Sequence, residues 1–199
     1  RFKRATGSAL QNKFLIQIQS PYSGSPGLMV YCRKGKYKAM LSKAQAERNA
    51  TMGIQRVDGD KKAYLPLLLL GDEQEDMIDR YLERGVLYVL EEEGETKALC
   101  LVTEEGDGVL EIKNMATEPR YQRRGYGKQL IEFLATAYRG THRLLRVGTG
   151  DSPATIPFYE ACGFRRHHRV KNFFTDHYDH PIYEGGVQLV DMVYLQRKL

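Results

Sequence analysis

Between residues 109 and 140 the chain has the pattern of a strand, a glycine-containing turn and a helix, and this order constrains the fold more than any other feature. Apolar and polar residues alternate from Val109 to Thr117, which predicts a β-strand. After Gly125 and Gly127, apolar residues recur at helical spacing until Gly140. Two glycines let the backbone approach a phosphate, and the first amides of a helix point at it. The segment therefore predicts an anion site.

Other glycine motifs fit this turn less well. A dinucleotide fingerprint needs a third glycine, but Gly127 is followed by Lys128, Gln129 and Leu130. A nucleotide P-loop needs a Gly-Lys-Ser or Gly-Lys-Thr sequence, which the chain lacks. Taken alone, the turn would be interpreted as a basic surface turn. A second segment, at residues 153–164, favours a functional interpretation.

Two motifs together resemble those of the GNAT superfamily, the acetyl-CoA-dependent N-acetyltransferases. The first is Gln/Arg-x-x-Gly-x-Gly/Ala, which corresponds to 122–127, and the second is Tyr-x-x-x-Gly-Phe, which corresponds to 159–164. The resemblance covers roughly residues 52–199. It implies an α/β fold with a mixed sheet, an antiparallel meander followed by central βα units, and fourth and fifth strands that splay apart. The pantetheine arm of acetyl-CoA is expected to enter that gap.

The order of predicted elements agrees with this fold. Met77, Ile78, Tyr81 and Leu82 form the apolar stripe of a helix that Gly85 ends. The remaining predictions are strands at 54–57, 86–90, 98–103, 109–117, 144–147, 166–174 and 187–195, and helical segments at 61–70, 125–139 and 154–161.

Charge divides the chain into two parts. Residues 1–51 contain ten Lys or Arg and only one acidic residue, so they carry +9, whereas the other residues carry −4. We predict a basic, loosely packed N-terminal extension at 1–51, with a strand around 14–16 and a weak helix at 41–48, and a GNAT domain at 52–199. Because that domain is mildly acidic, nucleic acid is not the expected partner.

Composition narrows the class further. The chain has three cysteines, Cys32, Cys100 and Cys162, and no Cys-x-x-Cys pair. Neither a disulfide framework nor a zinc site is therefore predicted, and we expect a cytoplasmic protein. The longest apolar run, Leu65–Leu70, is far shorter than the ~20 residues of a membrane span, so no membrane partner is expected.

The resemblance assigns roles to single residues. Tyr159 is the expected acid that protonates the departing thiolate, and Glu111, on the strand before the turn, is the expected base, acting directly or through water. The alternatives are a core tyrosine and a solvent-facing glutamate. Ser152 stands where many relatives have an asparagine, which weakens one contact to pantetheine. The expected acetyl-CoA-binding residues are Met115, Thr117, Gln122, Arg123, Arg124, Gly125, Tyr126, Gly127, Lys128 and Ser152.

The acceptor is expected to be a small primary amine, acetylated directly in a ternary complex. Residues 173–186 are rich in aromatic and acidic side chains, which suits a cation. His177 and His180 lie in this segment, but the chemistry needs no metal, and none is predicted. Two alternatives stay open: an acetyltransferase for protein N-termini or lysines, and a non-catalytic acyl-CoA sensor. The resemblance also implies pairing into a homodimer through the last strands.

Overall fold

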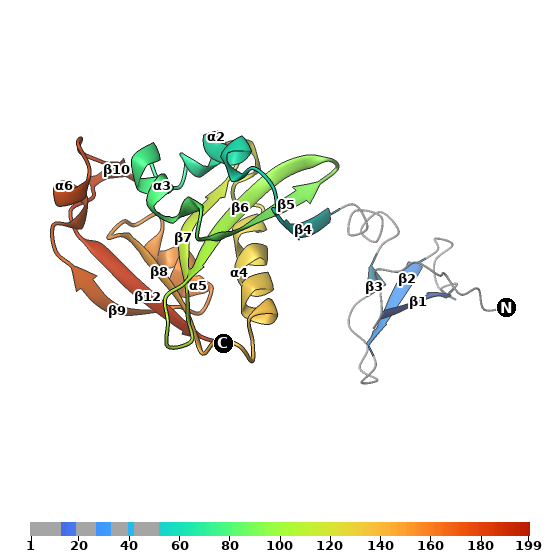
Figure 1. Cartoon of the computed structure of the whole chain (residues 1–199). Coiled ribbons are helices and arrows are strands. Elements are labelled where there is room, and N and C mark those ends of the chain that lie inside the picture. Colours follow the sequence, from blue (N-terminus) through green and yellow to red (C-terminus); the bar gives the residue numbers. More distant parts are fainter. Residues whose placement is uncertain (1–12, 19–26, 33–39, 42–51) are drawn as a thin grey trace. The chain divides into compact units, whose positions relative to one another are not determined.

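The computed structural model describes residues 13–18, 27–32, 40–41 and 52–199, with side chains described from Gly53 onward, and its elements form two compact units (Figure 1). In the first unit, β1 (Lys13–Ile18), β2 (Gly27–Cys32) and β3 (Met40–Leu41) form an antiparallel sheet in that order. The strand predicted around 14–16 lies within β1. Of the helix predicted at 41–48, Leu41 belongs to β3 and 42–48 lie outside the described residues.

A seven-stranded sheet forms the centre of the second unit. Its order is β4-β5-β6-β7-β8-β12-β9, with β7 and β8 parallel and with β12 antiparallel to both β8 and β9. This mixed α/β architecture confirms the predicted fold class. The strands are β4 (Met52–Arg56), β5 (Val86–Glu92), β6 (Glu95–Glu104), β7 (Val109–Thr117), β8 (Leu144–Gly150), β9 (Arg165–Val170) and β12 (Met192–Lys198).

Helices cover both faces of this sheet. On one face, α2 (Leu65–Leu68), which follows the 3₁₀ turn η1 (Lys61–Tyr64), and α3 (Glu75–Leu82) pack through Leu68 and Ile78 against Leu99 and Leu101 of β6. The four apolar residues predicted for α3 are all buried. On the other face lie α4 (Tyr126–Ala137) and α5 (Ile156–Ala161). Neighbouring strand residues point to opposite faces, so one strand can contact both layers.

Two predictions near the C-terminus were wrong. The strand predicted at 166–174 ends at Val170, and Phe173–His177 form the short helix α6 because Asn172 turns the chain with a φ of 56°. The strand predicted at 187–195 is interrupted: β10 (Tyr183–Glu184) and β11 (Val187–Gln188) form a separate hairpin before β12. Gly185 and Gly186 form its turn with φ values of 59° and 79°, and a two-residue hairpin turn of type I′ requires positive φ at both positions.

The parallel pair at the centre opens towards its C-terminal end. Pairing between β7 and β8 runs from Val109 opposite Leu144 to Ile112 opposite Val147, although both strands continue beyond these residues. At the same point β7 contains a bulge, because Leu101 pairs with Asn114 and Val102 with Ile112, which leaves Lys113 without an opposite residue on β6. A bulge bends the strand, so β7 turns away from β8 here, as the resemblance implied. Among the described residues, no helix has the length and apolar character needed to cross a membrane.

Candidate active site

A cavity of about 720 Å³ lies where β7 has parted from β8, between the glycine turn and α5. This volume is in the range of a site for a large organic ligand. Its lining combines the end of β7 with the turn, the first residues of α4 and one side of α5. The lining residues are Met115, Thr117, Gln122, Arg123, Gly125, Tyr126, Gly127, Lys128, Pro153, Ala154, Thr155, Pro157, Phe158, Tyr159, Ala161 and Cys162.

The turn before α4 has the conformation of an anion site. Arg123 and Gly125 both have positive φ values, 62° and 89°, and Gly125 is the N-cap of α4 without any side-chain cap. The first intrahelical bond runs from the amide of Gln129 to the carbonyl of Gly125 at 3.0 Å. The amides of Gly127 and Lys128 therefore donate to no carbonyl of their own helix, and the helix dipole adds positive potential at the same place.

The charges around the turn suit a diphosphate. Arg123 and Lys128 line the cavity, and among the described residues that line it there is no carboxylate. The guanidinium of Arg124 instead lies over the ring of Tyr121, with 5.3 Å between its carbon and the ring centroid. The side-chain amide of Gln122 donates to the carbonyl of Thr117 at 3.3 Å, which joins the turn to the end of β7.

Tyr159 lies at the inner wall of this cavity. Its side chain is buried, with the ring 5.1 Å from that of Phe158 and 5.6 Å from that of Phe164. Phe158 in turn lies so close to α4 that a Cβ on Gly127 would be 3.2 Å from its ring. Burial, and to a smaller extent nearby Cys100, Glu184 and Cys162, raises the pKa of the Tyr159 hydroxyl, so it is a protonated donor at neutral pH.

Cys162 also lines the cavity, but its environment does not activate it. The residue is buried, and burial is the main reason that the pKa of its thiol is raised. A nucleophilic cysteine needs a lowered pKa because the thiolate is the reactive form. The position of Cys162 therefore favours packing over formation of an acyl-enzyme.

Glu111 is absent from the residues that line the cavity. It lies on the α3 side of the sheet, before the bulge, and its side chain is only 4% exposed. Arg146 donates to one carboxylate oxygen through Nε and Nη2, both at 2.6 Å, and Lys113 donates to the other at 2.7 Å. Arg146 and Lys113 thus already pair with the carboxylate of Glu111, the residue that the sequence predicts as the base.

Ser152 is a further predicted residue that does not line the cavity. It is buried, and its hydroxyl accepts the amide of Ala154 at 3.0 Å, which stabilises the turn before α5. Conversely, Thr155 and Phe158 line the cavity although they were not among the site residues predicted from the sequence. Their position close to Tyr159 in the sequence could have indicated them, because residues of one short helix and of the turn before it can line the same wall of a cavity.

Comparison with known proteins agrees with this geometry. A family model described as an acetyltransferase (GNAT) domain matches residues 83–166. An uncharacterised N-acetyltransferase of Bacillus subtilis, YvbK, is 36% identical over 131 residues, which cover 65% of this chain and 84% of that protein.

Solved structures give the same result. A GNAT family acetyltransferase from Elizabethkingia anophelis with acetyl-CoA bound is 32% identical, with a TM-score of 0.70, over 75% of this chain and 99% of that chain. An IAA acetyltransferase from Bacillus cereus is also 32% identical, with a TM-score of 0.69, over 74% and 99% of the two chains. The chain therefore belongs to the GNAT family of N-acetyltransferases.

Proposed function

We propose that this enzyme transfers the acetyl group of acetyl-CoA directly to a small primary amine in a ternary complex. The observation that carries the proposal is the single cavity that runs from the glycine turn to Tyr159 beside the opened end of β7. One end can bind a diphosphate through amides and basic side chains, and the other presents a protonated hydroxyl. This is the arrangement that a thioester on a long phosphorylated carrier needs.

The parted strands supply binding groups for the carrier. Past Ile112, the backbone of β7 no longer pairs with β8, so amides and carbonyls around Met115 and Thr117 can bind the pantetheine amides as an added strand would. A β7 amide at or beside Met115, next to the bulge, would then stabilise the negative oxygen that develops on the acetyl carbonyl.

Transfer would proceed by attack of the neutral amine on the acetyl carbon. The C–N bond forms, the C–S bond breaks, and the sulfur takes a proton from Tyr159. Burial raises the pKa of the thiols of Cys100 and Cys162 beside this region, and it would make a coenzyme A thiolate in the same surroundings more basic as well. Burial raises the pKa of Tyr159 in the same direction, so the phenol and the thiol keep roughly the difference in pKa that they have in water.

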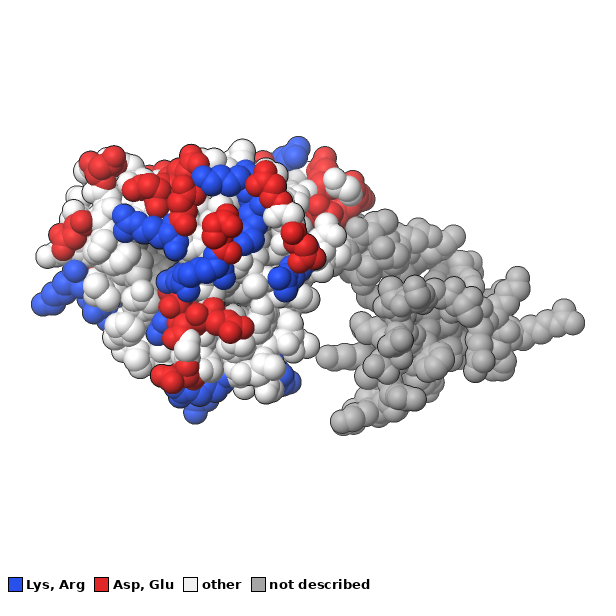
Figure 2. Space-filling model, in the orientation of Figure 1, with Lys and Arg blue, Asp and Glu red and all other residues white. Residues whose placement is uncertain are grey.

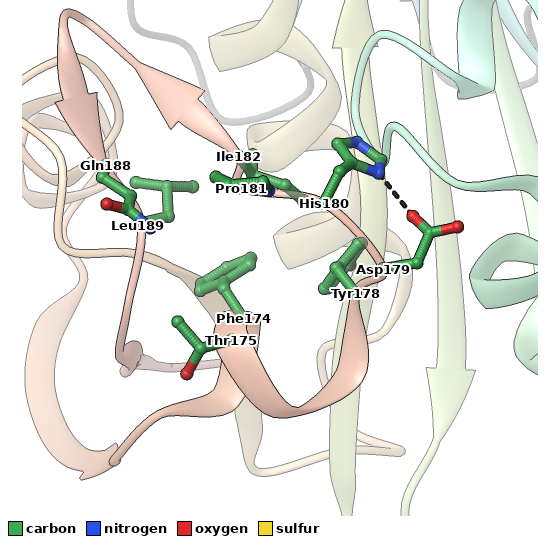
Figure 3. A pocket seen from close by; sticks show the side chains of 9 residues that line it. All are labelled: Phe174, Thr175, Tyr178, Asp179, His180, Pro181, Ile182, Gln188 and Leu189. Atoms are coloured by element: carbon green, nitrogen blue, oxygen red, sulfur yellow. Dashed lines mark hydrogen bonds and ion pairs between the residues drawn. The ribbon is translucent and has the colours of Figure 1, made fainter.

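The segment after β9 would bind the acceptor. It encloses a second cavity of about 210 Å³, around which Phe174, Tyr178 and Ile182 gather (Figure 3). Phe174 and Ile182 are buried together with Leu189. A cavity of this size, whose lining also includes the carboxylate of Asp179, fits a small amine better than a folded protein.

Acetylation of a panel of primary amines by the full chain tests the proposal. We expect release of free coenzyme A thiol with small cationic amines, measured with a thiol reagent, and little acetylation of a protein array. Acetylation of protein N-termini or lysines in preference to every amine would favour the protein acetyltransferase instead. Binding of acetyl-CoA without turnover of any acceptor would favour the alternative of a non-catalytic acyl-CoA sensor.

A substitution at Gly125 tests the anion site. Gly125 has a φ of 89°, and nothing lies within 4 Å of a Cβ placed there, so Gly125→Ala strains the backbone without causing a clash. We expect a loss of about 1–2 kcal/mol in unfolding free energy and, because the amides of the turn shift, roughly tenfold weaker binding of coenzyme A in calorimetry, which corresponds to about 1.4 kcal/mol.

Gly140, at the other end of the same helix, is the matched control. It has a φ of 95°, and a Cβ there would also meet nothing within 4 Å. Gly140→Ala should cost similar stability and leave coenzyme A binding unchanged. Equal effects of both variants on coenzyme A binding would remove the glycine turn from the proposed site.

Homodimer formation stays a prediction. β9 is the edge of the seven-stranded sheet, and all six of its residues are exposed, so its outer edge can pair with a second copy. Light scattering after size-exclusion chromatography would give twice the 22.8 kDa mass of the chain if the prediction holds.

A further inference from the structure

A half-buried carboxylate, Asp72, lies in the loop between α2 and α3. Its two oxygens accept hydrogen bonds from different elements: the hydroxyl of Tyr81 in α3 donates to one, and that of Tyr178 after α6 donates to the other, both at 3.0 Å. Tyr178 also lines the small cavity of Figure 3. Asp72 therefore lies where the α2–α3 loop meets the proposed acceptor segment.

The loop that carries Asp72 lies against the opened strand. A Cβ on Gly71 would be only 2.5 Å from Oδ1 of Asn114 and 3.2 Å from the carbonyl oxygen of Met115, both on β7 just past the bulge. Asn114 also donates from Nδ2 to the hydroxyl of Tyr81 at 3.1 Å. A chain of contacts thus joins Asp72 to the point where the strands part.

This contact is on the face opposite the acetyl-CoA cavity. Met115 and Thr117 line that cavity, whereas Asn114 contacts α3 on the other side of the sheet. If the carrier enters from the cavity, the opposite face of the parted strands, where the Asp72 loop lies, is the side left for the amine. We propose that Asp72 binds the ammonium group of the acceptor and takes its proton before attack, an inference that rests on the proposed function.

The partners of Asp72 leave it suited to this role. Glu111 is already held by Arg146 and Lys113, but the partners of Asp72 are two neutral hydroxyls and the amide of Gln74. A carboxylate has about four acceptor positions, and these three donors leave one of them for an ammonium. No cation is among the described groups that bond to this carboxylate, so an ammonium would pair with it without competition from one of these side chains.

The surroundings of Asp72 also favour proton transfer. Burial is the main cause that raises the pKa of this carboxyl, and the charge of Asp76 adds to it, while the bonds from Tyr178, Tyr81 and Gln74 lower it. Burial and the charge of Asp72 raise the pKa of both tyrosines, so they stay neutral donors. A carboxyl with a raised pKa is a stronger base and can take a proton from an ammonium more readily.

Other charges near this loop are exposed. Oε2 of Glu73 lies 3.6 Å from Nε2 of His180. Oδ2 of Asp76 lies 3.9 Å from Nη2 of Arg80. Acidic side chains gather on the end of the unit where α3 and α6 lie (Figure 2). They include Glu73, Asp76 and Asp179, whose side chains are 50%, 62% and 79% exposed. Their field would attract cations to the loop.

The proposed step is balanced. One N–H proton of the ammonium moves to a carboxylate oxygen of Asp72, and the freed lone pair forms the C–N bond. The C–S bond breaks, and the sulfur takes the proton of Tyr159. The nitrogen of the product loses its remaining extra proton to water, and Asp72 and Tyr159 then exchange protons with water to restore the starting state.

Asp72→Asn tests the inference, with Asp58→Asn as a control that removes an exposed carboxylate which lines neither cavity. The two acceptors would be the best alkylamine of the panel and its fluorinated analogue, which has nearly the same size but a low pKa and is neutral at the assay pH. We expect Asp72→Asn to lower kcat/KM about 100-fold or more for the alkylamine and only a few-fold for the analogue. Asp58→Asn should change neither by more than about threefold.

The pH profile provides a second readout. Activity of the wild type on the alkylamine should rise with pH as Asp72 ionises, and Tyr178→Phe, which removes a hydrogen bond that lowers the pKa of Asp72, should move that rise to higher pH. Equal losses on both acceptors, or an unmoved profile in Tyr178→Phe, would show that Asp72 has only a structural role.

Binding of coenzyme A, measured by calorimetry, separates this inference from the proposed function. We expect Asp72→Asn to bind coenzyme A as the wild type does. Wild-type turnover with an unimpaired Asp72→Asn variant would overturn the inference alone. A wild type that acetylates no amine would overturn the proposed function and the inference together.

Discussion

Replacing Tyr159 by phenylalanine is expected to lower kcat about 100- to 1,000-fold, the usual contribution of a positioned acid, while the affinity for acetyl-CoA stays within about twofold. The variant removes one hydroxyl and keeps the ring that packs between Phe158 and Phe164. The melting temperature should therefore change little. Single-turnover kinetics with a saturating amine would measure the chemical step directly.

The pH dependence of the wild type gives an independent check of the same role. Burial raises the pKa of Tyr159, so its hydroxyl stays protonated above the usual tyrosine value of about 10. Loss of this acid should therefore cause no decline in activity between pH 7 and pH 9.5. A decline in that range, present in the wild type and absent from Tyr159→Phe, would contradict the environment described here.

Tyr183→Phe is the matched control for Tyr159→Phe. Tyr183 is 60% exposed on β10 and lines neither cavity. Its hydroxyl should be dispensable, so both kcat and the affinity for acetyl-CoA should match the wild type. Unchanged kcat in Tyr159→Phe, with the control also unchanged, would mean that water or another group protonates the thiolate.

Replacing Glu111 by glutamine is expected to destabilise the fold. The side chain of Glu111 is 4% exposed, and Arg146 and Lys113 are only 24% and 23% exposed, so both cations would remain partly buried opposite a neutral amide. Removing one partner of a fully buried pair costs about 3–5 kcal/mol. The partial exposure of the two cations reduces the expected loss to about 2–3 kcal/mol in chemical unfolding, still a large fraction of the stability of one domain.

The double variant Arg146→Met/Glu111→Gln tests whether Glu111 acts through its ion pair with Arg146 or as a catalytic base. If Glu111 mainly holds Arg146, the double variant should recover part of the stability lost in Glu111→Gln, because the Arg146 charge is removed together with its partner and Lys113 keeps Glu105 at 3.7 Å. A fall in kcat that Glu111→Gln causes through lost stability should be reversed in the double variant as well. A kcat that stays low in a variant with recovered stability would instead support the base role expected from the sequence.

The sequence could predict the parts of the site that lie in short contiguous segments. The strand 109–117, the glycine turn and α4 were located from spacing alone, and the placement of Tyr159 in a helix followed from the second motif. These features depend on local rules: alternation in a strand, the freedom of glycine at positive φ, and amides without acceptors at the start of a helix. The residues of the glycine turn that line the cavity belong to this group.

Tertiary structure decided which side chains meet. The ion pair of Glu111 with Arg146 joins residues 35 positions apart, and the hydrogen bond of Tyr178 to Asp72 joins residues 106 positions apart. The first depends on the register of two parallel strands, and the second on where α6 packs. Neither leaves a periodic signal, because a contact between distant segments is fixed by the packing of the whole sheet and its helices rather than by the neighbours of either residue.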